Sequence, residues 1–475
     1  MTGYDRLSAL DSSFLHLETN ETPMHVGTLA VFEGGPFFDG SGRFRLADVR
    51  RRVATRLHLI PRFRKRLMSV AMEQGRPIWI DDDHFDISYH VRLTALGSPG
   101  SWDQLLALTA RIEAQRLDRA RPLWELWFVE GVESDRVALI QKTHHALVDG
   151  VSGVDVATVL LDFVPDPEVI VAPAWIPEAG PSSSRLLADT MVERSTEPGE
   201  IARSMRGMAR TPERAAARIG EIGRALRSLV DGSPIAPRTS LNVAVGPRRR
   251  FVGVRISLDD VKAIRRVVGG TVNDIVLAGV AGALRRRFAA RSEDLPDHLR
   301  VLCPVSVRAE DARLQLGNQV SAMFVDLPVA EPDPILRLRS ITATTHDLKD
   351  RQQAVGAAFL INLTQYAAPT MLGLAARLVH RQPFVNLVVT NVPGPQVPLY
   401  CMGARMVEAY PIVPLSQNLN LGVAILSYCG ILHFGLYADG DSHPDLVDLA
   451  ADLSASFAEL RHAGDQLNTE EGAVG

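Results

Sequence analysis

The feature that most restricts the fold of this chain is a strand-like segment that runs directly into a pair of histidines. Residues 136–143 predict a β-strand, in which successive side chains point to opposite faces. His144 and His145 continue this alternation, so their rings are expected on opposite sides. Ser152 is the predicted N-cap of a following helix, and Gly150 lets the chain turn between the two elements without a Cβ clash. The motif that begins with the histidines and ends at Gly150 is therefore placed at a strand-to-helix junction.

The pattern His-His-x-x-x-Asp-Gly at residues 144–150 resembles the signature of a large acyltransferase superfamily. That superfamily includes chloramphenicol acetyltransferase, the condensation domains of peptide synthetases, and the wax ester synthase/diacylglycerol acyltransferases. The resemblance is strongest to the last group, and it extends from about residue 7 to about residue 460. Each additional segment is a weak signal alone, but all of them in this order are specific. These segments are Pro122-Leu123-Trp124, Asn273-Asp274, Gly317-Asn318 and the run from Asn391 to Pro395.

The resemblance implies an α/β fold of two chloramphenicol-acetyltransferase-like subdomains, each a mixed sheet with flanking helices, with the active site in a channel between them. The composition divides the chain accordingly. Residues 1–165 form the predicted N-terminal subdomain, which carries the histidine motif, and residues 241–475 form the predicted C-terminal subdomain. Between them, residues 166–240 begin rich in Pro and Ser and continue as an arginine-bearing helical zone over 203–227, which predicts a long helical crossover linker.

Ester formation by this motif requires a base, because an alcohol is a poor nucleophile at neutral pH. A positioned histidine typically accelerates such a step by about 10²–10⁴-fold. The resemblance points to His145 as this base, with His144 structural. Asp149 has two possible roles: it holds His145 directly, as in a triad, or it pairs with an arginine and fixes the loop, as the resemblance implies. Arg62, Arg64, Arg66 and Arg308 are all open as that arginine.

The remaining motif residues have structural as well as substrate-binding interpretations. Thr271 and Asp274 match a capping box at the start of a helix, so Asn273-Asp274 is expected to stabilise that helix as much as to bind substrate. Pro122-Leu123-Trp124 precedes a predicted strand over 125–130, where Trp124 either lines an acyl pocket or packs in the core.

One acidic stretch could suggest a metal site, and one apolar stretch could suggest a membrane span. The triplet at residues 81–83 lacks the pattern of a calcium loop, and we interpret it as a loop entering a strand over 87–91; no metal is expected. Residues 419–438 contain no Asp, Glu, Lys or Arg, but their central Cys429-Gly430 predicts two core strands joined by a turn rather than a membrane span.

The composition argues against one class of function and indicates the compartment in which the protein is expected. The chain has 51 Lys and Arg against 55 Asp and Glu, a net charge of −4, which argues against a dedicated nucleic-acid binder. Its three cysteines suggest no disulfide framework and a reducing compartment. The charged N-terminus does not resemble a signal peptide, so a cytoplasmic location is expected.

The resemblance implies acyl-coenzyme A as co-substrate, no further cofactor, and diacylglycerol or a long-chain alcohol as acceptor. Such acceptors imply peripheral contact with the inner face of the membrane or a lipid droplet, through the arginines of 203–227 or a second basic cluster over 50–66. Coenzyme A phosphates favour a helix start, and those near Ser152 and Thr271 are both candidates. Two alternatives stay open: a carrier-protein-dependent acyltransferase acting on a polyketide or peptide alcohol, and a non-catalytic lipid-binding protein.

Overall fold

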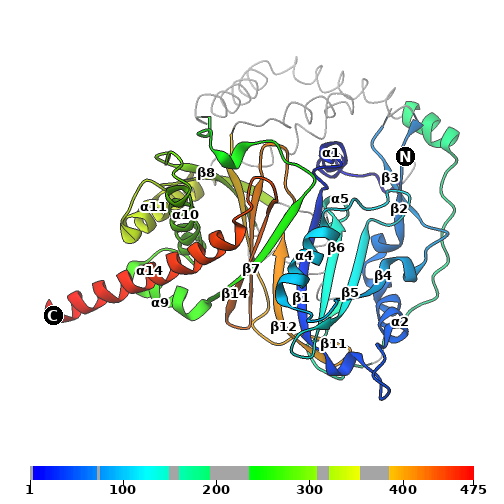
Figure 1. Cartoon of the computed structure of the whole chain (residues 1–475). Helices are drawn as coiled ribbons and strands as arrows, with labels where there is room; N and C mark the ends of the chain where they lie inside the picture. Colours follow the sequence, from blue (N-terminus) through cyan, green and yellow to red (C-terminus); the bar gives the residue numbers. More distant parts are fainter. Residues whose placement is uncertain are drawn as a thin grey trace, which may run out of the picture.

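Two six-stranded sheets, each with its own helices, lie side by side in the computed structural model (Figure 1). The structure describes residues 4–71, 75–148, 160–168, 170–192, 235–306, 320–352 and 384–474. This is the mixed α/β architecture with two sheet-and-helix halves that the sequence predicted.

The first sheet is built mainly from the N-terminal part of the chain. All neighbouring strands in it pair antiparallel except β4 and β5, which pair parallel. In spatial order, its strands are β11 (Tyr400–Cys401), β12 (Ala404–Ile412), β1 (His25–Glu33), β6 (Arg136–His144), β5 (Trp124–Val132) and β4 (Val91–Ala95). Around it lie the helices α1 (Ala9–Leu17), α2 (Leu46–Arg56) and α4 (Trp102–Glu113), and a separate hairpin of β2 (Lys65–Met68) and β3 (Ile78–Asp81).

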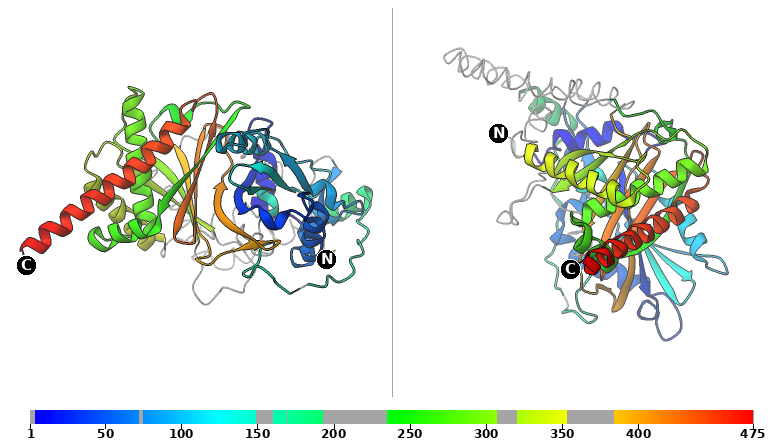
Figure 2. Two further views of the ribbon diagram at one scale, coloured as in Figure 1. Left: turned by 60° about the horizontal axis from the view of Figure 1, so that its bottom comes forward. Right: turned by 90° about the vertical axis from the view of Figure 1, so that its left-hand side faces the viewer.

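The second sheet contains the C-terminal strands, and its central strand β10 pairs parallel with both neighbours. Its strands in spatial order are β7 (Arg249–Ser257), β14 (Ile431–Asp439), β13 (Leu421–Tyr428), β10 (Leu387–Pro393), β8 (Leu299–Ser306) and β9 (Val320–Leu327). Four helices cover the face of this sheet that points away from the first half (Figures 1 and 2). They are α9 (Leu258–Val268), α10 (Val272–Ala290), α11 (Pro334–Gln352) and α14 (Leu446–Val474).

Helix α10 lies at the centre of this helical layer and is buried from Asp274 to Leu284. Its small residues permit this: a Cβ atom at Gly279 would lie only 2.5 Å from the Phe457 ring of α14. The Gly and Ala residues of α10 therefore serve close packing against α14. The helix begins with the predicted capping box, in which Thr271 and Asp274 satisfy each other's backbone N–H groups.

The two halves are joined by a strand that crosses between them. β12 comes from the C-terminal part of the chain, yet it pairs with β1 of the first sheet. β12 also packs against β14 of the second sheet, where Gly435 approaches the Pro411 carbonyl group so closely that a Cβ atom would overlap it. Helix α4 lies at the same junction, against β7.

Several local predictions can be compared with these elements. Residues 419–438 do form two strands, β13 and β14, joined by a turn in which Cys429 and Gly430 have φ values of 45° and 80°. The predicted strand over 87–91 is wrong: Ile87–His90 forms a short helix, α3, and the strand β4 begins only at Val91. The Asp86 side chain caps this helix by accepting the Ser88 N–H, a local hydrogen bond that overrides the β-favouring residues.

The segment that links the two halves is only partly described. Residues 170–182 run without helix or strand, and a helix follows over 183–192. The arginine zone 203–227 and the predicted helix after Ser152 lie outside the described residues. Among the residues that the structure describes, no single helix is long and apolar enough to span a membrane; α9 and α10 reach that composition only together, bent by 101°.

Candidate active site

The two motif histidines lie where β6 ends and a short helix, α5 (His145–Val148), begins. His144 closes the strand, and its side chain is almost fully buried, with 1% of the residue exposed. His145 opens the helix and is only partly buried. The two rings therefore differ in solvent access, and a proton-transferring base needs the access that His145 has.

The His144 ring is held by polar contacts on both nitrogens. Its Nδ1 accepts the Ala146 backbone N–H at 3.0 Å, which leaves the ring proton on Nε2. That Nε2 lies 3.6 Å from Oε1 of Glu18, the residue that ends α1. The ring also packs edge-on against His25, its partner across β1 and β6. His144 is thus fixed in one tautomer and orientation.

The His145 ring is supported by an aromatic stack. It lies on the Phe14 ring of α1 with 3.9 Å between centroids and an interplanar angle of 26°. The His145 backbone N–H donates to the Met24 carbonyl at 2.8 Å. Helix α1 therefore packs on the motif from a segment far from it in the sequence.

Glu18 is a buried carboxylate at the centre of these contacts. Its Oε2 accepts from Arg116 at 3.0 Å and from Arg119 at 2.7 Å, and its Oε1 accepts the Met24 N–H at 3.3 Å. Burial opposes ionisation of Glu18, but the polar interactions with His144 and His25 outweigh it and hold its pKa well below the usual range. Glu18 is therefore a carboxylate at neutral pH.

His25 completes this buried cluster as a neutral ring. Burial lowers its pKa to about 3, against the smaller opposing effect of Glu18. Its Nε2 lies 3.3 Å from Glu18 Oε1. The cluster thus combines one carboxylate and two guanidinium groups around two histidine rings.

Pro122-Leu123-Trp124 lies directly beside the motif. The Leu123 carbonyl accepts the His144 N–H at 3.0 Å, and Trp124 faces Thr143 across β5 and β6. Trp124 is 1% exposed, donates its indole N–H to the Phe63 carbonyl at 2.8 Å, and stacks on the buried His90. The structure therefore places this tryptophan in the core that supports the end of β6.

Other motif residues lie in the second half. Asp274 accepts the Thr271 N–H at 2.7 Å and the Thr345 hydroxyl at 2.7 Å, so its carboxylate is engaged within the helical layer. Asn273 is partly buried in the first turn of the same helix. The run from Asn391 to Pro395 continues β10, and Gly394 donates its N–H to the Ser427 hydroxyl.

The remaining predicted site residues cannot be placed, because Asp149, Gly150, Gly317 and Asn318 lie outside the described residues. So does Arg308, one of the four arginines considered as the partner of Asp149. The other three have partners elsewhere: Arg62 bonds Asp5, Arg64 bonds the Ala54 carbonyl, and Arg66 lies 3.8 Å from Asp82.

Sequence reasoning missed Glu18, Phe14, Met24 and Lys142. Lys142 is fully buried two residues before His144, and it donates to the Ile112 and Gln115 carbonyls at the end of α4. Its amino group donates to carbonyls at the C-terminal end of α4, where a helix leaves its last carbonyl groups unpaired, and burial lowers the Lys142 pKa. Only the strand alternation, which puts positions 142 and 144 on one face, could have indicated Lys142; no local pattern marks Glu18.

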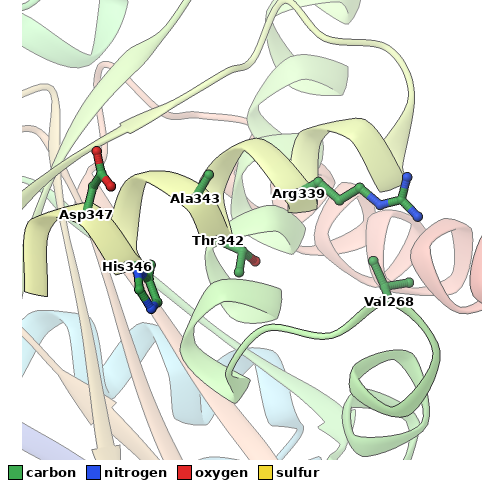
Figure 3. Close-up of a pocket in the computed structure, with 6 residues that line it drawn as sticks. All are labelled: Val268, Arg339, Thr342, Ala343, His346 and Asp347. Carbon is green, nitrogen blue, oxygen red and sulfur yellow. The ribbon is translucent and has the colours of Figure 1, made fainter. Parts of the chain in front are cut away.

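Two hollows of about 440 Å³ each lie away from the histidines. The first lies between α11 and the end of α9, and Figure 3 shows Arg339, His346 and Asp347 pointing in different directions along α11. The second lies at the junction of the two halves and is lined in part by Arg136, Arg255, Glu408 and Tyr410. The polar side chains of the first do not converge on one point, and neither hollow is lined by a motif residue.

Nearly the whole chain matches proteins of one known family. Residues 7–276 match the family described as the wax ester synthase/diacylglycerol acyltransferase catalytic domain, and residues 316–461 match its C-terminal domain. Two proteins of Mycobacterium tuberculosis named as probable diacylglycerol O-acyltransferases, tgs2 and tgs1, are 34% and 33% identical. The matches cover 97% and 96% of this chain, and 99% and 96% of the relatives.

Solved structures show the same fold. A wax ester synthase/diacylglycerol acyltransferase from Marinobacter aquaeolei VT8 is 28% identical, with a TM-score of 0.68 over 97% of this chain and 100% of that chain. The first condensation domain of the CDA synthetase is 14% identical, with a TM-score of 0.54 over 97% of this chain and 96% of that chain. At that identity, the second likeness concerns the fold alone.

Proposed function

We propose that this chain moves an acyl group from acyl-coenzyme A to diacylglycerol, with His145 as general base. The chain belongs to the wax ester synthase/diacylglycerol acyltransferase family and is an acyltransferase. The product is triacylglycerol, or wax ester when the acceptor is a long-chain alcohol. The observation that carries the proposal is the contrast between the two histidines. The His144 ring is locked and buried, whereas the His145 ring is stacked on Phe14 and only partly buried.

The proposed reaction transfers the acyl group directly to the acceptor, without a covalent enzyme intermediate. His145 takes the proton of the acceptor hydroxyl while the hydroxyl oxygen attacks the thioester carbonyl carbon. The resulting tetrahedral intermediate collapses, the C–S bond breaks, and the coenzyme A sulfur takes the proton from His145. An ester and free coenzyme A leave, and the base is regenerated as a neutral ring.

The Asp149 role that we propose is to pair with an arginine and fix the loop, as the wider superfamily suggests. Arg62, Arg64 and Arg66 already have partners in the first half. Breaking a buried ion pair on one side leaves an uncompensated charge, which typically costs about 3–5 kcal/mol. This role therefore predicts that Asp149 affects stability together with activity.

Two helix starts are candidates for binding the coenzyme A phosphates, and both carry an acidic residue in the first turn. At the start of α10 the Asp274 carboxylate already accepts the Thr271 N–H, so a phosphate there would meet a negative charge. Asp155 holds the same position relative to Ser152, so charge does not separate the two helix starts, and both stay candidates for binding the phosphates.

The proposed membrane contact rests on the arginine zone 203–227. The alternative basic cluster over 50–66 is partly neutralised within the fold: Arg51 pairs with Asp48, Arg52 with Asp162, and both Arg62 and Lys65 with Asp5. Charges that are paired in this way attract an anionic lipid surface less than free ones. A peripheral contact through 203–227 at the inner face of the membrane is the proposal that remains.

The deciding experiment measures transfer of radiolabelled palmitoyl-coenzyme A to diolein and, in parallel, to hexadecanol. We expect labelled ester from the wild type and from His84→Ala, a variant of an exposed histidine, and at least a 100-fold loss in His145→Ala. Wild-type activity in His145→Ala would exclude it as the base. An intact thioester with every protein would redirect the donor to an acyl carrier protein, and binding of lipid without turnover across further acceptors would support a non-catalytic role.

A further inference from the structure

We propose that Glu18 positions His145 for proton transfer through two separate routes that start from its Oε1 atom, a polar contact with His144 and a hydrogen bond from Met24. The inference deepens the proposed function, because it assumes that His145 is the base. Glu18 does not touch the reacting atoms. It acts on the backbone and the neighbours that fix where the His145 ring lies.

The first route runs through the preceding residue. Glu18 Oε1 lies 3.6 Å from Nε2 of His144, and the opposite nitrogen of that ring accepts the Ala146 N–H at 3.0 Å. One imidazole therefore joins the carboxylate to the peptide that follows His145. A neutral imidazole has one donor and one acceptor nitrogen: here Nδ1 accepts the Ala146 N–H, and Nε2 faces the carboxylate at a distance longer than a hydrogen bond. The carboxylate selects the tautomer in which Nδ1 accepts.

The second route runs through Met24. The same Oε1 accepts the Met24 N–H at 3.3 Å, and the Met24 carbonyl accepts the His145 N–H at 2.8 Å. The carboxylate therefore anchors residue 24, whose other polar group holds the backbone of the proposed base. The two routes reach His145 from both sides of its backbone.

A third contact comes from the same N-terminal helix. Phe14 stacks on the His145 ring, and Glu18 is the C-cap of α1 four residues later. The position of α1 therefore sets the ring stack and the carboxylate together. Arg119 strengthens this link, because it donates to the Leu15 carbonyl of α1 as well as to Glu18 Oε2.

Charge explains why a carboxylate is suited to this position. Burying an ionised carboxyl is costly unless it is paired and hydrogen-bonded. Arg116 and Arg119 supply the pairing at Oε2 from the partly exposed side, which leaves Oε1 for the histidine and Met24. An amide in its place cannot serve both sides, because one end of an amide donates where both sides require an acceptor.

Glu408 provides a matched control for the general effect of losing a buried carboxylate. It is also buried, accepts from Arg136 at 3.4 Å and Arg255 at 3.1 Å, and accepts the Tyr410 hydroxyl at 2.7 Å. It belongs to the same sheet, but its Arg136 partner begins β6, whereas the histidines lie at the other end of that strand. Glu408→Gln should therefore lose stability without disturbing His145.

The test compares Glu18→Gln with Glu408→Gln in the full-length protein, using palmitoyl-coenzyme A and diolein. We expect kcat to fall about 10–100-fold in Glu18→Gln with KM within about threefold, because displacement of a catalytic group by about 1 Å costs up to about 10² in rate. Glu408→Gln should keep kcat within about twofold. Glu18→Asp, which keeps the charge but is one methylene shorter, should have an intermediate kcat and serves if the Gln variant does not fold. Equal kcat losses in the Glu18 and Glu408 variants, or a rise in KM alone, would overturn the proposal.

A spectroscopic readout separates this proposal from the proposed function. In protein labelled with ¹⁵N-histidine, the His144 signals should report a proton on Nε2 in the wild type and in Glu408→Gln, and a mixture of tautomers in Glu18→Gln. That change in a protein without measurable acyl transfer would show that Glu18 fixes the His144 ring and would count against the proposed function. An unchanged His144 tautomer together with unchanged kcat in Glu18→Gln would refute the positioning role alone.

Discussion

Replacing Gly435 with alanine should force the two halves of the molecule apart where β12 and β14 approach closely. Gly435 lies in β14, which pairs with both β13 and β7 inside the second sheet. A Cβ atom there would lie 3.0 Å from the Pro411 carbonyl carbon of β12, closer still to its oxygen, and 3.1 Å from the Phe251 ring. The added methyl group therefore meets backbone on one side and an aromatic ring on the other.

The magnitude follows from how little either strand can yield. Non-bonded heavy atoms pack at about 3.5 Å or more, and the added Cβ atom would overlap the Pro411 carbonyl oxygen, so β12 and β14 would have to move apart by more than about 1 Å. β12 is paired to β1 of the first sheet, and β14 is paired on both edges, so neither can shift alone. Overpacking against such an obstacle costs about 3 kcal/mol, the upper end of the usual range.

Urea unfolding followed by circular dichroism measures this cost as a lower midpoint. The matched control is Gly464→Ala, the same substitution within α14, where a Cβ atom meets nothing within 4 Å. Alanine should stabilise that helix by about 1 kcal/mol, so the two variants should shift the midpoint in opposite directions. A Gly435→Ala protein as stable as the wild type would refute the close approach of the two strands.

Two further predictions concern titration and thiol reactivity. Burial lowers the pKa of His433 to about 4, below the value of about 6.5 for an exposed histidine, so its contribution to stability is complete above pH of about 6.5 and is lost as the pH falls towards 4. The melting temperature should therefore fall as the pH decreases over that interval. In His433→Leu the free energy of unfolding should fall by less than in the wild type, by up to roughly 3 kcal/mol; parallel curves for the two proteins would contradict the assignment. Ellman's reagent should titrate Cys429 rapidly in the native protein, because it is exposed, whereas burial raises the pKa of Cys303 and Cys401 to about 12. Rapid reaction of either buried thiol would contradict their burial.

Local patterns in the sequence determined the elements that local physics controls. The alternation over 136–143 predicted β6, and Cys429-Gly430 predicted the turn between β13 and β14, because a tight turn tolerates the positive φ values found there. Thr271 and Asp274 predicted the start of α10, because a capping box is formed by residues only three positions apart. The prediction over 87–91 failed for a reason of the same kind, since the Asp86 cap outweighed strand propensity.

The histidine motif itself was found from the sequence, and so was the family. The sequence also singled out Pro122-Leu123-Trp124, but it left open whether the tryptophan lines a pocket or packs in the core. Its burial against Phe63 and His90 answers that question, and only packing could do so. The choice of His145 as base and the roles of Asp149 and Asn273 stay predictions.

What only the tertiary structure decided are the contacts between residues far apart in the chain. Nothing near Glu18 in the sequence indicates that it meets His144, Met24 and two arginines, because that meeting depends on the pairing of β1 with β6 and on where α1 packs. The crossing of β12 into the first sheet is likewise invisible in its own sequence. Short-range patterns fix backbone conformation through steric and hydrogen-bonding preferences of neighbours, whereas strand register and helix packing are set by the burial of the whole chain.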